Sequence, residues 1–324
     1  KPRPPDPIFG PRLQSEGKLR EMLAVHYLSG RFADGAVPVA WITSGAPVEL
    51  LRPFGYHLVY PENHAALCGA QKVAVPLQEK AEEKGYDREL CGYARCDLGT
   101  AFGGKTPVGR LPRPDLLVAC TNICQTVLFW YRVLAAHYRV PLVVVDTPFV
   151  YGEARPYQID YVARQLESLV DVAAGVANKK LDEALFVKAL LDSQRGTDLW
   201  GMCLAQSKNK PSPWSAFDQF IHMAPIVAMR GTPECNDYYA MLLAELKDRS
   251  QQGIGSIRDE KYRLLWDNLP VWYRMRGLGS KLAERGFNLI IATYTNAWAE
   301  TVSLVGEGEI DLFRAQAKAY LHVF

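Results

Sequence analysis

Short apolar runs alternate with helical stretches along the first half of the chain, and this alternation limits its fold more than any other feature. Four such runs lie near turns rich in Gly, Pro and Ser, and stretches with helical spacing of apolar residues separate them. This order is typical of a parallel sheet with helices on its faces. We therefore expect an α/β fold with strands at 37–43, 56–60, 116–119 and 142–145, the last buried on both faces.

Helices are expected between these strands. Apolar residues recur with a helical spacing over 13–28, and a single helix is expected over 65–84, closed by Gly85. Cys91 opens a short helix, and a long amphipathic helix covers 122–138. The aromatic residues at 129–131 of that helix are expected to be core or interface.

The second half of the chain differs in pattern from the first. Residues 157–249 are mostly helical, and strands at 262–266 and 287–293, with a helix at 275–285 between them, start the alternation again. We expect two parallel-sheet α/β domains with a helical segment between them. The expected divisions are an N-terminal helical arm at 1–35, the first α/β domain at 36–155, the helical segment at 156–260 and the incomplete second α/β domain at 261–324.

Composition excludes several classes of protein. The chain has 324 residues, and its 37 basic and 35 acidic side chains leave a net charge of +2. Such an even balance provides no broad basic face, so nucleic-acid binding is not expected. No apolar run approaches the ~18 residues that span a bilayer, and the charged, Pro-rich N-terminus lacks the apolar core of a signal peptide. We expect a cytoplasmic protein that does not enter a membrane.

Residues 99–106 match the phosphate-loop pattern G-x-x-x-x-G-K-S/T letter for letter. That loop needs a buried strand before it and a helix after it, so that backbone N–H groups face the phosphates. Pro107, Pro112 and Pro114 follow the pattern, and no helix can start from Thr106. We therefore expect a Gly-rich connection and no nucleotide site.

The cysteines are the residues with the most chemical content. Of seven, five lie between positions 68 and 124, and such crowding in a large cytosolic chain favours metal or redox chemistry over disulfides. Their spacing is not that of a structural zinc site, and buried free cysteines often only pack, so both interpretations stay open. The five are Cys68, Cys91, Cys96, Cys120 and Cys124.

Ser44 and Glu62 each follow an expected strand, so both should project from the carboxyl edge of the sheet, as should Cys124. Ligands bind at this edge in open α/β sheets. The alternatives are that Ser44 only caps a helix and that Glu62 only starts one. His64 could act as a base, but we expect a surface residue.

Five segments together resemble one family. They are SGAPVELLRPFG from Ser44, YPENHAALC from Tyr60, LCGYARCDLG from Leu90, PDLLVACTNIC from Pro114 and DTPF from Asp146. They are similar to the 2-hydroxyacyl-CoA dehydratase family, which includes benzoyl-CoA reductase large subunits and double-cubane cluster proteins. The segment RLLWDNLP from Arg263 also fits, so the resemblance extends through most of the chain.

The resemblance implies two flavodoxin- or Rossmann-like domains around a 4Fe-4S cluster held by three cysteines. Two of the ligands correspond to Cys91 and Cys124. The third would come from a C-terminal domain beyond residue 324, which implies an incomplete chain; otherwise Cys68, Cys203 or Cys235 takes its place. The serine and glutamate beside the cluster correspond to Ser44, a hydrogen-bond donor to the thioester, and Glu62, the acid/base group.

The resemblance also implies one-electron chemistry on an acyl-CoA substrate. A separate ATP-hydrolysing iron–sulfur activator would reduce the cluster, a ketyl radical would form on the thioester, and a homologous second subunit would complete the enzyme. The leading expectation is dehydration of an (R)-2-hydroxyacyl-CoA. The alternatives are benzoyl-CoA reduction, a double-cubane 8Fe-9S cluster that uses the extra cysteines, a non-catalytic electron-transfer partner, or a cluster-free protein whose cysteines only pack.

Overall fold

The computed structural model describes residues 6–299 and 311–321. Two compact units make up the chain. We call residues 25–191 with 302–324 the sheet unit, because a four-stranded sheet lies in it, and residues 1–24 with 192–301 the helical unit. The domain boundaries and the two-domain arrangement expected from the sequence stay predictions.

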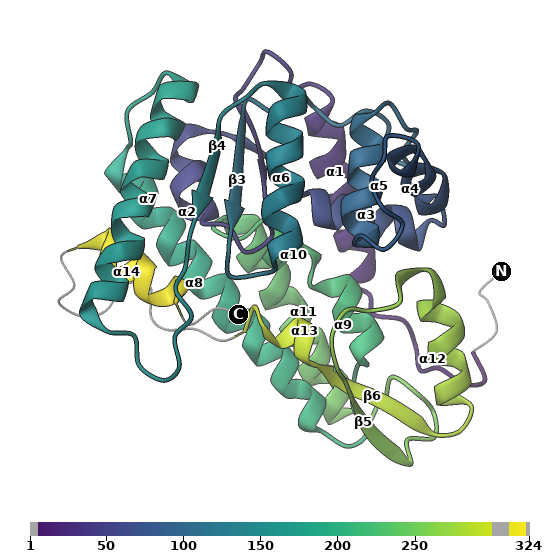
Figure 1. Cartoon of the computed structure of the whole chain (residues 1–324). Coiled ribbons are helices and arrows are strands. Elements are labelled where there is room, and N and C mark those ends of the chain that lie inside the picture. The colour runs from purple at the N-terminus through teal and green to yellow at the C-terminus, as the bar shows by residue number, and fades with distance from the viewer. Residues whose placement is uncertain (1–5, 300–310, 322–324) are drawn as a thin grey trace. The chain divides into compact units, whose positions relative to one another are not determined.

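The sheet of the sheet unit is parallel throughout, with strand order β2-β1-β3-β4. Its strands β3 and β4 lie side by side in Figure 1. The pairing of β1 with both neighbours sets Trp41 between Val59 and Leu117. The α/β class with a parallel sheet is thus confirmed, and the strands occur where the apolar runs predict them. They are β1 (Val39–Ile42), β2 (His57–Val59), β3 (Leu116–Cys120) and β4 (Leu142–Val145).

Helices surround this sheet, and none among the described residues combines the length and apolar character needed to cross a bilayer. Those of the sheet unit are α2 (Val48–Leu51), α3 (Pro61–Ala70), α4 (Ala74–Glu82), α5 (Gly92–Ala101), α6 (Gln125–Tyr138), α7 (Pro156–Ala177) and α14 (Leu312–Tyr320). Helices α1 (Glu16–Gly30) and α8 (Glu183–Ala205) have residues in both units. Short 3-10 helices cover Arg52–Phe54, Gln206–Lys208 and Trp272–Arg274.

The core of the sheet unit forms on both faces of the central strands. Every residue of β1 and β3 is buried, because successive side chains of a strand point to opposite faces and helices cover both. Trp41 and Leu117 pack with Leu134 of α6 in one apolar cluster. Strand β4 is different: it lies at the edge of the sheet, and only Val145 is fully buried. The expectation that β4 is buried on both faces is therefore wrong.

The single helix expected over 65–84 is two helices, α3 and α4. Lys72 has a positive φ of 59°, which ends α3 in a left-handed turn. Pro76 then lies in the first turn of α4, where its missing N–H costs no helical hydrogen bond. Pro76 is thus the sequence signal for the break.

The phosphate-loop pattern has no phosphate-loop structure. Gly99 lies inside α5, and an added Cβ there would collide with the Leu77 carbonyl of α4. The first glycine of the pattern therefore serves the close approach of two helices. The preceding segment is helix rather than strand, so the context that a phosphate loop needs is missing. The expectation of a Gly-rich connection is wrong at its start, because residues 99–101 belong to α5.

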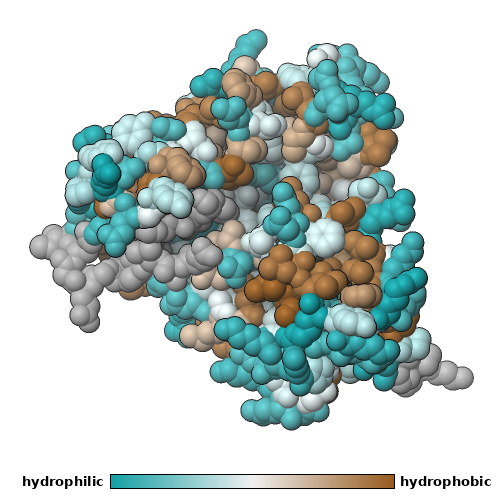
Figure 2. Space-filling model, turned by 60° about the horizontal axis from the view of Figure 1, so that its bottom comes forward, coloured by the Kyte–Doolittle hydropathy of each residue, from teal (hydrophilic) through white to brown (hydrophobic). Residues whose placement is uncertain are grey.

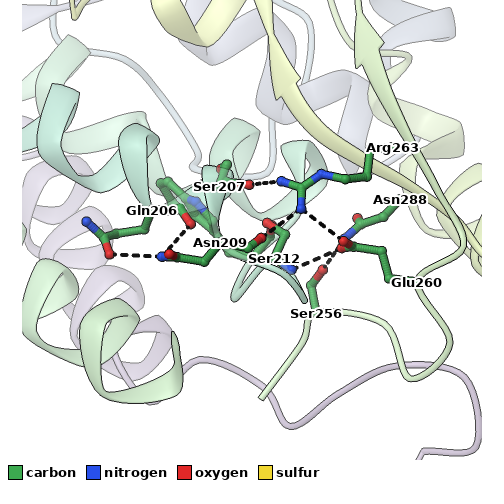
Figure 3. A network of polar contacts seen from close by, with 9 residues as sticks. Gln206, Ser207, Asn209, Ser212, Ser256, Glu260, Arg263 and Asn288 are labelled. Carbon is green, nitrogen blue, oxygen red and sulfur yellow. Dashed lines mark hydrogen bonds and ion pairs between the residues drawn. The ribbon is translucent and has the colours of Figure 1, made fainter. Parts of the chain in front are cut away.

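The helical unit contains a parallel pair, β5 (Tyr262–Trp266) and β6 (Phe287–Ala292), with α12 (Met275–Ala283) between them in the chain. Its other helices are α9 (Ala216–His222), α10 (Ala224–Ala228), α11 (Pro233–Gln251) and α13 (Thr293–Asn296). Figure 3 shows how the pair is anchored: the Arg263 side chain donates to the carbonyls of Ser207 and Asn209 and pairs with Glu260. The other carboxylate oxygen of Glu260 accepts from Asn288 of β6 at 2.7 Å.

Apolar side chains are exposed on β5 and the loop after it, namely Tyr262, Leu264, Leu265 and Leu269. Figure 2 turns the bottom of Figure 1 forward, where β5 and β6 lie, and shows apolar side chains gathered in one area among hydrophilic ones. Exposed apolar areas of this kind are typical of surfaces that bind further polypeptide.

Candidate active site

Ser44 and Glu62 meet at the carboxyl edge of the sheet. Ser44 lies in the turn between β1 and α2, and Glu62 lies in the first turn of α3, directly after β2. The Ser44 backbone N–H donates to Glu62 Oε1 at 3.1 Å, and its hydroxyl donates to the same oxygen at 3.3 Å. The prediction that both project from one edge is confirmed. The alternative that Ser44 only caps a helix is wrong, because Pro47 is the N-cap of α2.

Helix α6 provides a second contact to Glu62. The Tyr131 hydroxyl donates to Glu62 Oε2 at 3.4 Å, from a side chain that is fully buried. Donors from two different elements therefore hold the two oxygens of the carboxyl. A group held in this way has a defined plane, which suits proton transfer to one position.

Burial raises the pKa of Glu62 to about 7. The backbone N–H of Glu62 and the two Ser44 donors oppose this shift, because they stabilise the ionised form, whereas the charge of Asp97 adds to it. At neutral pH, protonated and ionised Glu62 are therefore both populated. This is the condition in which one carboxyl can both accept and donate a proton in a reaction cycle.

Asp97 of α5 is a second fully buried carboxylate. Its Oδ2 accepts from Trp130 Nε1 at 2.9 Å, and its Oδ1 lies 4.0 Å from His64 Nδ1. Among the described residues, Asp97 Oδ1 and His64 Nδ1 have no hydrogen-bond partner. Burial raises the pKa of Asp97 to about 6, although the charge of His64 and the bond from Trp130 lower it.

His64 is fully buried, so the expectation of a surface residue is wrong. It lies on the side of α3 that packs against α5, and its Nε2 is 3.7 Å from Cys68 Sγ. Cys68 is itself buried in an apolar cluster with Cys96 and Leu77. The Cys96 thiol and the His64 ring lower the pKa of Cys68 by hydrogen bonding.

Cys91 and Cys124 are the two exposed cysteines among the seven, and each lies at a helix start. Cys91 is the N-cap of α5 and Cys124 is the N-cap of α6, and neither side chain caps its helix by a hydrogen bond. A helix N-terminus stabilises negative charge, which suits a thiolate ligand. Among the described residues no three His, Cys, Asp or Glu side chains form a metal-binding group, so Cys68 does not complete a three-ligand site there.

The end of β4 adds a further carboxylate to this edge. Asp146 accepts from the Thr121 hydroxyl and from the Tyr161 hydroxyl, each at 2.8 Å. Gln165 of α7 donates to the Asp146 carbonyl and accepts from its N–H. The loop after β4 is thus fastened to the turn after β3 and to α7, at the edge that also carries Ser44 and Glu62.

Sequence reasoning missed two residues of this site, Asp97 and Tyr131. The sequence predicts that Tyr131 is core or interface, which its burial confirms, but its hydroxyl also reaches Glu62. One indirect signal exists, because a buried Tyr or Trp usually needs a polar partner. Nothing in the sequence identifies that partner, since Tyr131 and Glu62 are 69 residues apart.

Comparison with known proteins shows the family of this chain. The family model described as 2-hydroxyglutaryl-CoA dehydratase, D-component, matches residues 43–324. The (R)-2-hydroxyisocaproyl-CoA dehydratase alpha subunit of Clostridioides difficile is 34% identical over 87% of this chain and 70% of its own length.

Two further relatives differ in the reaction that their names describe. The (R)-phenyllactyl-CoA dehydratase alpha subunit of Clostridium sporogenes is 33% identical over 80% of this chain and 64% of its own length. A benzoyl-CoA reductase subunit of Thauera aromatica is 29% identical over 86% of this chain and 68% of its own length. This chain thus spans about two thirds of the length of such relatives. It belongs to the 2-hydroxyglutaryl-CoA dehydratase D-component family.

Proposed function

We propose that this chain is a subunit of an enzyme that dehydrates an (R)-2-hydroxyacyl-CoA. The observation that carries the proposal is the buried Glu62 carboxyl, held by Ser44 at the carboxyl edge of the sheet with a pKa raised to about 7. The names of the relatives support the substrate class, since three that are 33–34% identical are alpha subunits of such dehydratases.

Glu62 has the properties that this dehydration requires. A 2-hydroxyacyl-CoA loses a hydroxyl from C2 and a proton from C3, and the two leave as water. One carboxyl that takes the proton as a base and returns it to the departing hydroxide performs both transfers. A pKa near 7 lets Glu62 act in both directions at neutral pH.

Ser44 is proposed to donate a hydrogen bond to the thioester carbonyl. Its backbone N–H and its hydroxyl both contact Glu62 Oε1. The hydroxyl can therefore turn toward a substrate while the N–H keeps that oxygen partnered. A donor aimed at a carbonyl stabilises the negative charge that develops on it during reaction.

Cys91 and Cys124 are proposed as two ligands of a 4Fe-4S cluster. The chemistry of the donors fits: both thiols are exposed, uncommitted to capping bonds and at helix N-termini. Such a cluster would supply one-electron reduction of the thioester. The third ligand is proposed to come from another segment. Cys68, which is buried beside His64 and completes no three-ligand group among the described residues, is the alternative within this chain.

The reaction is tested with the full-length protein, purified without oxygen and combined with a homologous second subunit and an ATP-hydrolysing iron–sulfur activator. We expect a 2-enoyl-CoA from an (R)-2-hydroxyacyl-CoA and none from its (S) enantiomer, as followed by mass spectrometry. Ring reduction of benzoyl-CoA with no dehydration would favour the second candidate function, which the 29% identical reductase relative supports. Neither product from an iron-loaded complex would refute both.

Iron and acid-labile sulfide content tests the ligands. We expect about four irons per full-length chain, or about eight if the cluster is a double cubane. Cys91→Ser and Cys124→Ser should each lose most of this iron, whereas Cys203→Ser is the control, because Cys203 is buried in the helical unit against the Tyr239 carbonyl. Loss of iron from Cys68→Ser would identify the third ligand. Wild-type iron in the Cys91 and Cys124 variants would contradict the assignment.

A further inference from the structure

Two neighbouring aromatic residues of α6 hold two buried carboxylates. Trp130 donates to Asp97 of α5, and Tyr131 donates to Glu62 of α3. The two rings are buried and lie edge to face with centroids 5.6 Å apart. A close-packed pair of this kind has little freedom, so α6 fixes both carboxylates together.

Tyr131 determines how the Glu62 carboxyl lies. Ser44 donates to Oε1, and Tyr131 donates to Oε2 from the helix α6. A hydrogen bond donated to a carboxylate favours its ionised form. Removal of the Tyr131 hydroxyl would therefore take one donor from Oε2 and make Glu62 hold its proton more tightly.

Asp97 acts in the opposite direction. Its carboxylate is buried, and its Oδ1 has no hydrogen-bond partner among the described residues, so its charge is poorly screened. That charge disfavours ionisation of Glu62. Other titratable groups lie around the pair. His64, Cys68, Cys96 and Tyr138 interact with Asp97, and Cys120 of β3 acts on Tyr131.

We propose that Tyr131 and Asp97 are positioning residues for Glu62. Tyr131 holds Oε2 by a hydrogen bond, and Asp97, which accepts a hydrogen bond from the neighbouring Trp130, acts on Glu62 through its charge. Neither touches the substrate. The importance of Tyr131 and Asp97 for catalysis rests on the proposed function, whereas their effect on the ionisation of Glu62 does not.

The test compares two variants that should change Glu62 in opposite directions. In Tyr131→Phe the pH midpoint of Glu62 ionisation should rise, because a hydrogen-bond donor to the carboxylate is lost. The acid dissociation constant of Glu62 should become about threefold to tenfold smaller. In Asp97→Asn the midpoint should fall to a similar extent, because a negative charge is lost while the amide oxygen can still accept from Trp130. The midpoint is measured on full-length protein without substrate, from the infrared band of the protonated carboxyl, which Glu62→Gln identifies.

Tyr138→Phe is the matched control, since Tyr138 lies on the same helix and packs against Trp41 instead. The pH midpoint of Glu62 ionisation in this variant should equal that of the wild type. Shifts of the same sign in Tyr131→Phe and Asp97→Asn, or no shift in either, would overturn the proposal.

A second probe serves if the phenylalanine variant does not fold. The hydroxyl of 3-fluorotyrosine at position 131 is a stronger hydrogen-bond donor, so it should lower the midpoint of Glu62. A raised or unchanged midpoint would overturn the proposal equally. Opposite shifts in a protein that dehydrates no acyl-CoA would uphold the positioning roles and refute only the activity.

Discussion

Replacement of Glu62 by Gln is expected to lower kcat of the assembled, full-length enzyme by about 10²- to 10⁴-fold. The amide has nearly the same shape and can still accept the hydrogen bonds from Ser44. It cannot take up and release a proton at neutral pH, which is the role proposed for the carboxyl. KM for the acyl-CoA should change little, because the substitution removes proton transfer and not a binding contact.

Glu49→Gln is the matched control for this prediction. Glu49 is another buried glutamate of the sheet unit, and its carboxylate accepts from Gln316 of α14 at 3.0 Å. Glutamine at this position can keep that bond, so kcat should remain within about twofold of the wild type. Wild-type turnover in Glu62→Gln would refute the acid/base role, whatever reaction the enzyme proves to catalyse.

The second large effect concerns stability. Gly99→Ala should lower the free energy of unfolding by about 3 kcal/mol, because the new methyl group has no space beside the Leu77 carbonyl. The helices α4 and α5 must separate or bend to admit it, and backbone atoms cannot swing aside as a long side chain does. Urea unfolding followed by circular dichroism measures the change.

Gly175→Ala in α7 is the control for this substitution. It lies in the same unit, and nothing stands within 4 Å of an added Cβ there. Alanine should stabilise the protein by up to ~1 kcal/mol, since it favours helix more than glycine does. Equal stability of Gly99→Ala and the wild type would mean that α4 and α5 do not approach as closely as described. It would also reopen the interpretation of residues 99–106 as a phosphate-binding loop.

The fold was predictable from the sequence as far as it depends on local patterns. Apolar runs and helical spacing located β1 to β4, and the rule that parallel strands end at one edge brought Ser44 and Glu62 together. The same patterns failed at His64, because a single residue in a helix does not reveal whether another helix covers it. They failed at β4 because an apolar run does not distinguish an edge strand from a central one.

The electrostatic environment of the site depends on pairing between distant residues. Trp130 and Asp97 are 33 positions apart, and no periodicity connects them. Their meeting follows from the packing of α5 against α6, which is a property of the whole fold. The candidate active-site residues were therefore predictable, whereas those that tune the acidity of Glu62 were not.

The helices α5 and α6 impose a fixed spacing on the chain. Each begins with an exposed thiol, Cys91 or Cys124, and each carries about two turns later a residue that acts on Glu62, Asp97 or Tyr131. Two helical turns extend roughly 10 Å, so the helix itself sets the separation between each thiol and the carboxylate pair. Loss or gain of one residue in either stretch would rotate Asp97 or Tyr131 by about 100° away from its partner. Drift in evolution can thus exchange residues along these segments, whereas an insertion or a deletion would change the position of each thiol relative to Asp97 or Tyr131.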